Sequence, residues 1–237
     1  MQDAVGVLAE GAGGVVVARA IQARLPKEDV SVLADHAYAP YASRPARTVT
    51  ARAPALAAEL AAGGIKLLVV ASLQMGEDAL QAIAEAAAVP TLALDATLPH
   101  AAALARSGRI AAVWAEGTLR AGPWLRRHRF ERGGAEVVPL PWHGLAAAVE
   151  AGRHPDGASV PEVPDDCVVA LLDPYAATQA ARFSDAVDCT EVAAERVHRQ
   201  LVRMQALARR QRAGRILLRS SHPVRAQGAL RGPHVTT

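Results

Sequence analysis

The sequence is poor in aromatic residues and in cysteine, and it has no long hydrophobic run. Only 3% of its 237 residues are aromatic although 51% are hydrophobic, so the apolar mass is mainly alanine, valine and leucine. Alanine favours helices and close packing over large pockets. No stretch of about 18 uncharged apolar residues is present, so we expect no membrane-spanning helix.

The two cysteines, Cys167 and Cys189, lack the spacing of a metal site or a redox pair. The histidines show no close metal-ligand spacing either, and we expect neither a metal nor a cofactor. A strand begins within the first residues, with no basic segment leading into an apolar one, so we expect no secretion signal. These absences together predict a cytoplasmic protein with reduced thiols.

Short apolar runs alternate with alanine-rich segments, a pattern typical of repeated β-α units. The expected strands are residues 5–8, 30–33, 67–70, 91–94, 110–114, 137–140, 168–172, 186–188 and 216–218. The expected helices are residues 13–25, 51–62, 77–87, 98–106, 119–129, 145–151, 176–183 and 191–212.

This pattern predicts an α/β fold of two pseudo-symmetric lobes, each a parallel sheet flanked by helices, with a cleft between the lobes. We expect residues 1–96 and 213–237 to form the N-terminal lobe and residues 97–212 the C-terminal lobe, whose long last helix returns to the first lobe. Ligands of open parallel sheets bind outside the carboxyl ends of the strands. Glu10, Asp35 and Asp173 follow expected strands and would place three acids around the cleft.

Three acids in a cleft allow two interpretations. Paired carboxylates act as general acid and base or bind a cation, and they would repel a dicarboxylate ligand. The alternative is that these acids are solvated at loop edges. His36, next to Asp35, is a further candidate for the cleft wall, with a packing or surface role as its alternative.

Several ordered segments resemble the glutamate racemases. Residues 5–14 resemble the family opening Asp-Ser-Gly-x-Gly-Gly, with Ala9 and Glu10 in place of the acid and the serine. Asp35 followed by Pro40-Tyr41 is similar to the family segment Asp-x4-Pro-Tyr-Gly, whose last glycine is Ala42 here. Further similar segments are residues 108–110, 118–122, 188–193 and 220–221.

The resemblance fails at the catalytic positions. The family racemises without a cofactor by using two cysteine thiols on opposite faces of the substrate, in the motifs Ala-Cys-Asn-Thr and Gly-Cys-Thr-His-Tyr. Ser72 and Leu172 stand at these two positions. A serine hydroxyl is a base only with an activating partner, and leucine exchanges no proton. The neighbouring polar positions are also changed, to Leu73, Gln74, Asp173 and Pro174.

Tyr41 and Thr118 stand at positions that contact ligand in the family; alternatively, Pro40-Tyr41 shapes its loop and Thr118 caps a helix. The cleft and ligand candidates are Glu10, Gly11, Asp35, Pro40, Tyr41, Ser72, Gln74, Thr118, Asp173 and Tyr175.

The sequence therefore predicts a racemase-like protein without racemase activity that acts as a binding, regulatory or structural partner. The resemblance implies a homodimer or a heterodimer with a related racemase, and a link to peptidoglycan synthesis. Trp124 is a candidate anchor for a protein partner, with packing under a helix as its alternative. A second hypothesis is a changed small-molecule chemistry in the cleft, or residual glutamate racemisation.

The third hypothesis rests on charge. Ten arginines and no acidic residue follow Glu195, and such a segment attracts phosphates. Arg209, Arg210 and Arg212 are the candidates for binding nucleic acid or another polyanion. The alternative is a solvated helix face in an arginine-rich protein.

Overall fold

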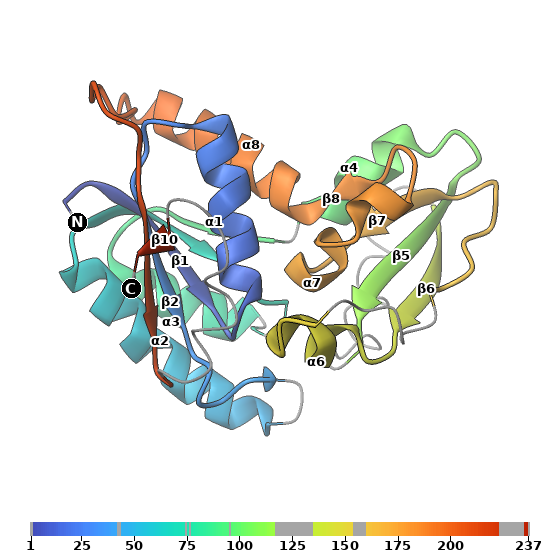
Figure 1. Ribbon diagram of the computed structural model, residues 1–237, viewed down its shortest axis with the longest axis horizontal. Helices are drawn as coiled ribbons and strands as arrows, with labels where there is room; N and C mark the ends of the chain where they lie inside the picture. Colours follow the sequence, from blue (N-terminus) through green and yellow to red (C-terminus); the bar gives the residue numbers. More distant parts are fainter. Residues whose placement is uncertain are drawn as a thin grey trace.

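The computed structural model describes residues 2–41, 44–73, 75, 77–94, 96–116, 135–153, 160–222 and 235–236. The expectation of an α/β fold is confirmed: two separate sheets, each of parallel strands, are flanked by helices (Figure 1). None of the described helices combines the length and the apolar character that a membrane crossing requires.

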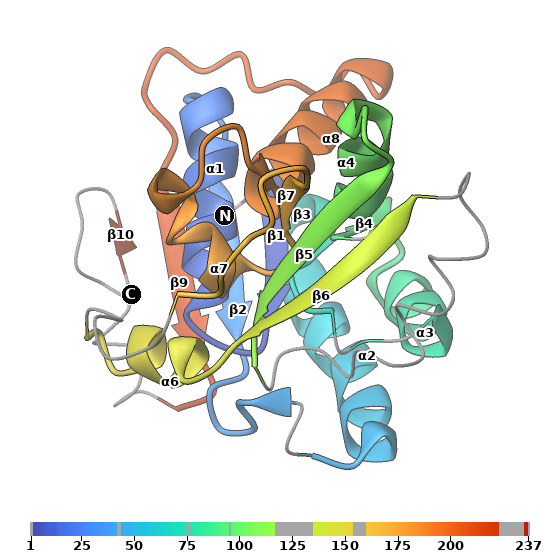
Figure 2. The ribbon, with the colours of Figure 1, turned by 90° about the vertical axis from the view of Figure 1, so that its right-hand side faces the viewer.

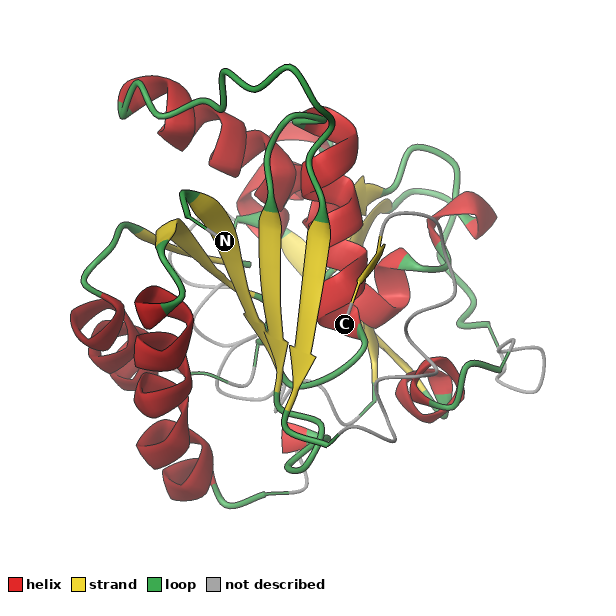
Figure 3. Ribbon diagram, turned by 60° about the vertical axis from the view of Figure 1, so that its left-hand side comes forward, coloured by secondary structure: helices red, strands yellow, loops and turns green. Residues whose placement is uncertain are grey.

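The first sheet has six parallel strands in the order β10-β9-β2-β1-β3-β4. Its strands are β1 (Ala4–Ala9), β2 (Val30–Ala34), β3 (Ile65–Val70), β4 (Thr91–Ala93), β9 (Ile216–Ser220) and β10 (Val235–Thr236). The central strands β1 and β2 are buried throughout, because helices cover both faces of the sheet, and this explains their continuous apolar runs. Figure 3 shows the sheet with helices on either side.

Two hydrophobic clusters form the core of this lobe. On one face, α1 (Gly13–Arg24) and α8 (Cys189–Arg203) pack on the sheet. On the other face, α2 (Ala46–Ala62) and α3 (Glu77–Ala87) do so. The observed bounds of α3 are those predicted, and α2 begins five residues earlier than expected.

The second sheet has four parallel strands in the order β6-β5-β7-β8, and Figure 2 shows β6, β5 and β7 side by side. Its strands are β5 (Arg109–Ala115), β6 (Glu136–Trp142), β7 (Val168–Leu171) and β8 (Val187–Asp188). The helices of this part are α4 (Thr97–Leu104), α6 (Leu145–Glu150), α7 (Pro174–Ala177) and the 3-10 turn η2 (Ala180–Arg182). The two prolines of β6 fit its place at the sheet edge, where missing amide donors do not interrupt a ladder. The helix expected over residues 119–129 lies outside the described residues.

The helix expected over residues 176–183 is wrong in its bounds. Asp173 caps α7 through two backbone amides and Pro174 occupies its first turn, which favours an earlier start. The Thr178 hydroxyl then donates to the carbonyl of Tyr175 at 2.6 Å, at the end of the helix. A short helix and a separate 3-10 turn result.

The expected helix over residues 191–212 is also wrong at its carboxyl end, because α8 stops at Arg203. Gln205 adopts a left-handed conformation with φ 53°, and the Ala206 amide donates back to the Leu201 carbonyl, a local arrangement that ends helices. The helix does reach the first lobe: Val197 and Leu201 share a hydrophobic cluster with Ile21. The proposed division of the chain into lobes at specific residues stays a prediction.

Candidate functional site

Residues that follow strands of both sheets come together between the lobes. Glu10 follows β1, Asp35 and His36 follow β2, and Asp173 lies two residues beyond β7. Parallel strands bring such positions to one edge of each sheet, where ligands of this architecture bind.

A cavity of about 510 Å³ lies between the loop after β2 and α6; the lining residues do not include Glu10, Asp35, His36 or Asp173. Ala39 and Pro40, from the loop after β2, form one part of its wall. Ala146, Glu150 and Tyr175, from α6 and α7, form another. The cavity is therefore bounded by both lobes, as the predicted cleft requires.

Asp35 accepts hydrogen bonds from three side chains. It is buried, and both of its carboxylate oxygens accept hydrogen bonds from Arg52 of α2, at 2.6 and 2.9 Å. Ser221 and Tyr41 donate to it as well, at 2.7 and 3.1 Å. Burial alone would raise the pKa of Asp35, but the bonds from Arg52, Ser221 and Tyr41 outweigh burial and lower it. Asp35 is a fixed anion whose charge is already neutralised.

Glu10 has a different environment. Its side chain is buried and accepts one hydrogen bond from the backbone amide of Tyr41, at 2.6 Å. Burial raises the pKa of Glu10 to about 8; the Tyr41 amide opposes this, while the nearby charges of Asp173 and Glu150 add to it. Glu10 is therefore mainly protonated at neutral pH.

Asp173 has a structural role in the site. One of its oxygens accepts from the amides of Tyr175 and Ala176, at 2.8 and 2.9 Å. The other accepts from the amide of Ala115 at the end of β5, at 2.6 Å. Asp173 caps α7 and ties it to the second sheet. Since Glu10, Asp35 and Asp173 are all buried, the interpretation that they are solvated at loop edges is wrong.

Glu150 is a site residue that the sequence reasoning missed. One of its carboxylate oxygens accepts from the Ala12 amide at 2.8 Å and from the Tyr175 hydroxyl at 2.6 Å. The other lies 3.7 Å from Nε2 of the buried His36, whose Nδ1 contacts the Ser220 hydroxyl at 2.7 Å. Its local sequence, an alanine-rich helix, gives no signal of these partners.

The two positions that the resemblance assigns to catalytic cysteines are both buried. Leu172 is 1% exposed and belongs to a hydrophobic cluster with Leu98 and Trp114. Ser72 is 5% exposed.

The cysteines that the chain does contain do not replace them. Cys189 is fully buried in the core, and burial, with the nearby Asp188 and Asp173, raises the pKa of its thiol well above the ordinary value. Cys167 precedes β7, at the end opposite Leu172, and is only partly buried.

Four residues named in the sequence analysis, Ala42, Gln74, Thr118 and Trp124, lie outside the described residues. Gly11, Pro40, Tyr41 and Tyr175 lie at the site: Pro40 lines the cavity, and Tyr41 contacts both Glu10 and Asp35. Burial, with the charges of Glu10 and Glu150, raises the pKa of Tyr175 well above its ordinary value, so its hydroxyl keeps the proton that it donates.

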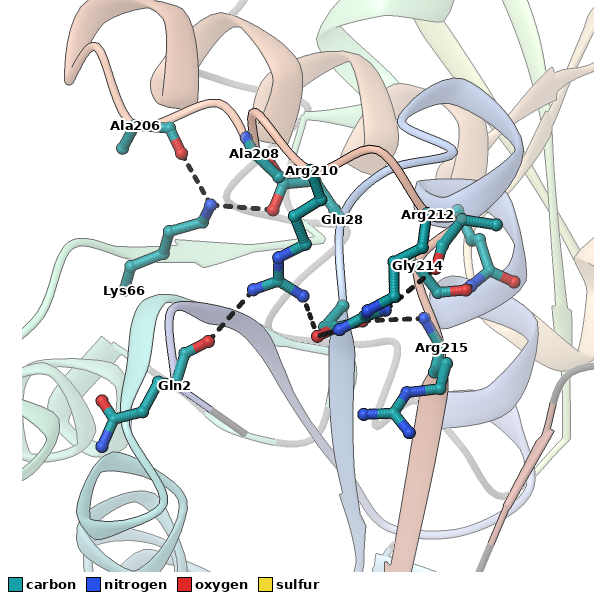
Figure 4. A network of polar contacts seen from close by, with 12 residues as sticks. Gln2, Glu28, Lys66, Ala206, Ala208, Arg210, Arg212, Gly214 and Arg215 are labelled. Carbon is teal, nitrogen blue, oxygen red and sulfur yellow. Dashed lines mark hydrogen bonds and ion pairs between the residues drawn. The ribbon is translucent and has the colours of Figure 1, made fainter.

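The arginines proposed for polyanion binding lie in the segment between α8 and β9, and two of them have internal partners (Figure 4). Arg210 and Arg212 form ion pairs with the buried Asp29. The neighbouring Glu28 is paired with Lys66 at 2.7 Å. Arg209 is exposed. Arg210 and Arg212 thus share the single negative charge of Asp29, and the polyanion hypothesis stays a prediction.

The guanidinium of Arg52 is paired with Asp35. Within the described ranges, no group of three or more His, Cys, Asp or Glu side chains is placed to hold a metal ion.

No protein-family model matches the chain. The chain is similar to the glutamate racemase of Ralstonia nicotianae, 34% identical over 151 residues that cover 64% of this chain and 54% of that protein. It is 36% identical to the glutamate racemase of Deinococcus radiodurans over 155 residues, covering 63% and 52%. The chain thus spans about half the length of these curated relatives.

A solved structure adds evidence on the fold. The glutamate racemase from Thermus thermophilus, in complex with beta-chloro-D-alanine, superimposes with a TM-score of 0.74 at 23% identity. The match covers 100% of this chain and 95% of that one. The two proteins share a fold over the matched residues.

Proposed function

This chain belongs to the glutamate racemase family, and we propose that it is a member that does not racemise amino acids and acts instead as a binding or regulatory protein. The observation that carries this proposal is Leu172, a buried core residue at a position assigned to a catalytic cysteine. A second copy of this chain or a related racemase, as a dimer partner, and a link to peptidoglycan synthesis stay predictions.

The chemistry of racemisation supports the proposal. One base must remove the Cα proton on one face of the substrate, and an acid must return a proton on the other. Leu172 has no titratable group, and the pKa of a serine hydroxyl is far above neutrality unless a base activates it. The buried carboxylate of Asp173 also disfavours an anionic substrate such as glutamate.

The decisive experiment follows solvent deuterium entering the Cα of D- and L-glutamate and of aspartate by NMR. Even one-sided proton exchange is detected in this way. We expect no exchange, while an active glutamate racemase exchanges under the same conditions. Exchange that disappears in Ser72→Ala would overturn the proposal and identify Ser72 as a base.

The environment of Glu10 favours a second candidate function, a changed small-molecule chemistry in the same cleft. A carboxyl whose pKa is raised to about 8 can give up and take back a proton near neutral pH. Glu10 also lies next to Tyr41, close to the cavity wall. It is the described residue best suited to act as a general acid or base.

The raised pKa of Glu10 predicts a pH-dependent stability. In the unfolded chain this carboxyl ionises near its ordinary pKa of 4.5, but in the folded protein it stays protonated up to about pH 8. Its contribution to folding is therefore complete below about pH 4.5 and is lost as the pH rises towards 8. We expect Glu10→Gln to remove a slope of about 1.4 kcal/mol per pH unit in this window.

Urea unfolding of wild type and Glu10→Gln at pH 5, 6, 7 and 8 measures this slope. Glu162→Gln, a substitution of an exposed glutamate, is the matched control and should follow the wild-type curve. Parallel curves for wild type and Glu10→Gln would show that Glu10 is ionised in the folded protein and would remove the support for the second candidate.

A further inference from the structure

Glu150 joins the two lobes through a single carboxylate. It is the last residue of α6, beside the second sheet, and it accepts a hydrogen bond from the Ala12 amide at the start of α1, beside the first sheet. Figure 1 shows α6 at the junction of the two parts, near the start of α1. Ala12 and Glu150 are 138 residues apart in the chain.

The groups around this contact favour a carboxylate at the position that Glu150 occupies. The Tyr175 hydroxyl donates to the same Glu150 oxygen at 2.6 Å, which holds the carboxylate in place from its own lobe. The amides at the start of a helix carry partial positive charge and favour a carboxylate. The His36 ring of the first lobe lies 3.7 Å from the other oxygen.

Gly11 leaves the space that Glu150 occupies. A Cβ atom at Gly11 would lie 2.1 Å from the Glu150 carboxylate and 2.9 Å from the Tyr175 hydroxyl. Both distances are far below van der Waals contact, so any side chain at this position would displace the carboxylate. Glycine at position 11 is thus required for the interlobe contact.

We propose that Glu150 is an interlobe latch, which holds α6 against the start of α1 and fixes the separation of the lobes around the cavity. Glu150 and Tyr175 also line that cavity, so release of the latch widens the site. This role goes beyond the proposed function, because it holds whether the cleft binds a ligand, catalyses a reaction or does neither.

The test requires no ligand and uses two measurements. The hydrogen–deuterium exchange rate of the Ala12 amide, read by NMR, reports the hydrogen bond to Glu150. The radius of gyration from X-ray scattering reports the separation of the lobes. In Glu150→Ala we expect the Ala12 exchange rate to rise about tenfold or more, because a hydrogen bond to a charged acceptor is lost, and the radius of gyration to increase.

Three further variants sharpen the test. Glu150→Gln keeps an oxygen acceptor and should retain most of the Ala12 protection. Gly11→Ala displaces the carboxylate and should reproduce the effect of Glu150→Ala. Glu162→Ala removes an exposed glutamate elsewhere in the chain and should match the wild type.

An unchanged Ala12 exchange rate and radius of gyration in Glu150→Ala would overturn the latch. If Glu150→Ala does not fold, Tyr175→Phe decides the question, since it removes only the hydroxyl that holds Glu150. We expect the Ala12 exchange rate to rise several-fold in Tyr175→Phe, and a wild-type rate would overturn the proposal. None of these readouts depends on amino-acid exchange, so failure of the latch is separable from failure of the proposed function.

Discussion

Replacing Gly214 by alanine is expected to lower the free energy of unfolding by about 3 kcal/mol or more. A Cβ atom at this position would lie 1.8 Å from the backbone oxygen of Glu28 and 2.5 Å from its carbonyl carbon. No rotamer change relieves a clash with backbone, so the two segments must separate.

The separation would break several hydrogen bonds at once. The Gly214 amide donates to the Pro26 carbonyl at 2.8 Å, and the Gln22 side chain donates to the Gly214 carbonyl at 2.9 Å. The next residue, Arg215, accepts from the Val30 amide where β9 begins to pair with β2. Because β9 ends at Ser220, a displaced β9 would also disturb the contacts of Ser220 and Ser221 with His36 and Asp35.

Urea unfolding of Gly214→Ala measures the loss, and Gly108→Ala is the control. Gly108 has φ +72° and open space around its Cβ position, so alanine there carries only the conformational cost, about 1 kcal/mol. A loss in Gly214→Ala no larger than that of Gly108→Ala would mean that the Glu28 backbone yields without breaking the β9–β2 pairing.

The alternation of strands and helices could be predicted because it depends on local signals. The apolar runs of β1, β2 and β3 have the continuous pattern of strands covered on both faces. The end of α8 could not be predicted. The arginine-rich sequence after Arg203 is compatible with a helix, but Asp29, more than 170 residues earlier in the chain, binds Arg210 and Arg212 in an extended segment.

The candidate site was predictable to the same extent. Glu10, Asp35 and Asp173 follow strands, so a strand pattern places them at the cleft. Their burial, and the partners that set their charge, depend on residues distant in sequence: Arg52 for Asp35, and Tyr41 for Glu10. Glu150 was missed for the same reason, because only the fold brings it to Ala12.

These partners explain how a cleft can hold several acids and stay folded. Asp35 is neutralised by Arg52, Asp173 is stabilised by three amides, and Glu10 is held as the protonated acid. Each acid avoids the cost of an uncompensated buried charge in a different way. Removing any one partner therefore exposes that cost, and the largest effect is expected for Arg52.

Replacing Arg52 by methionine is expected to lower the free energy of unfolding by about 3 kcal/mol at pH 7, because Asp35 would remain buried without its cation. Methionine keeps an apolar stem but lacks the guanidinium. In the wild type the guanidinium carbon of Arg52 also lies over the Tyr38 ring, 4.1 Å from its centroid. Tyr41 and Ser221 still donate to Asp35, so the protein should fold. Arg47→Met, at an exposed position of the same helix, is the control and should change stability by less than about 0.5 kcal/mol.

The pH dependence separates the ion pair from general packing. The pKa of Asp35 is lowered in the folded protein, so its stabilising contribution is present above the unfolded value of 3.8 and is lost as the pH falls through the lower folded value. The difference in stability between wild type and Arg52→Met should therefore shrink as the pH falls below about 4.

The double variant tests the same ion pair at constant pH. In Arg52→Met combined with Asp35→Asn, the loss of stability should be smaller than the sum of the two single losses. Two results would contradict this: additive losses in the double variant, and a stability difference between wild type and Arg52→Met that does not change with pH. They would mean that Arg52 acts through its packing on Tyr38, and that the charge of Asp35 is balanced by Tyr41 and Ser221 alone.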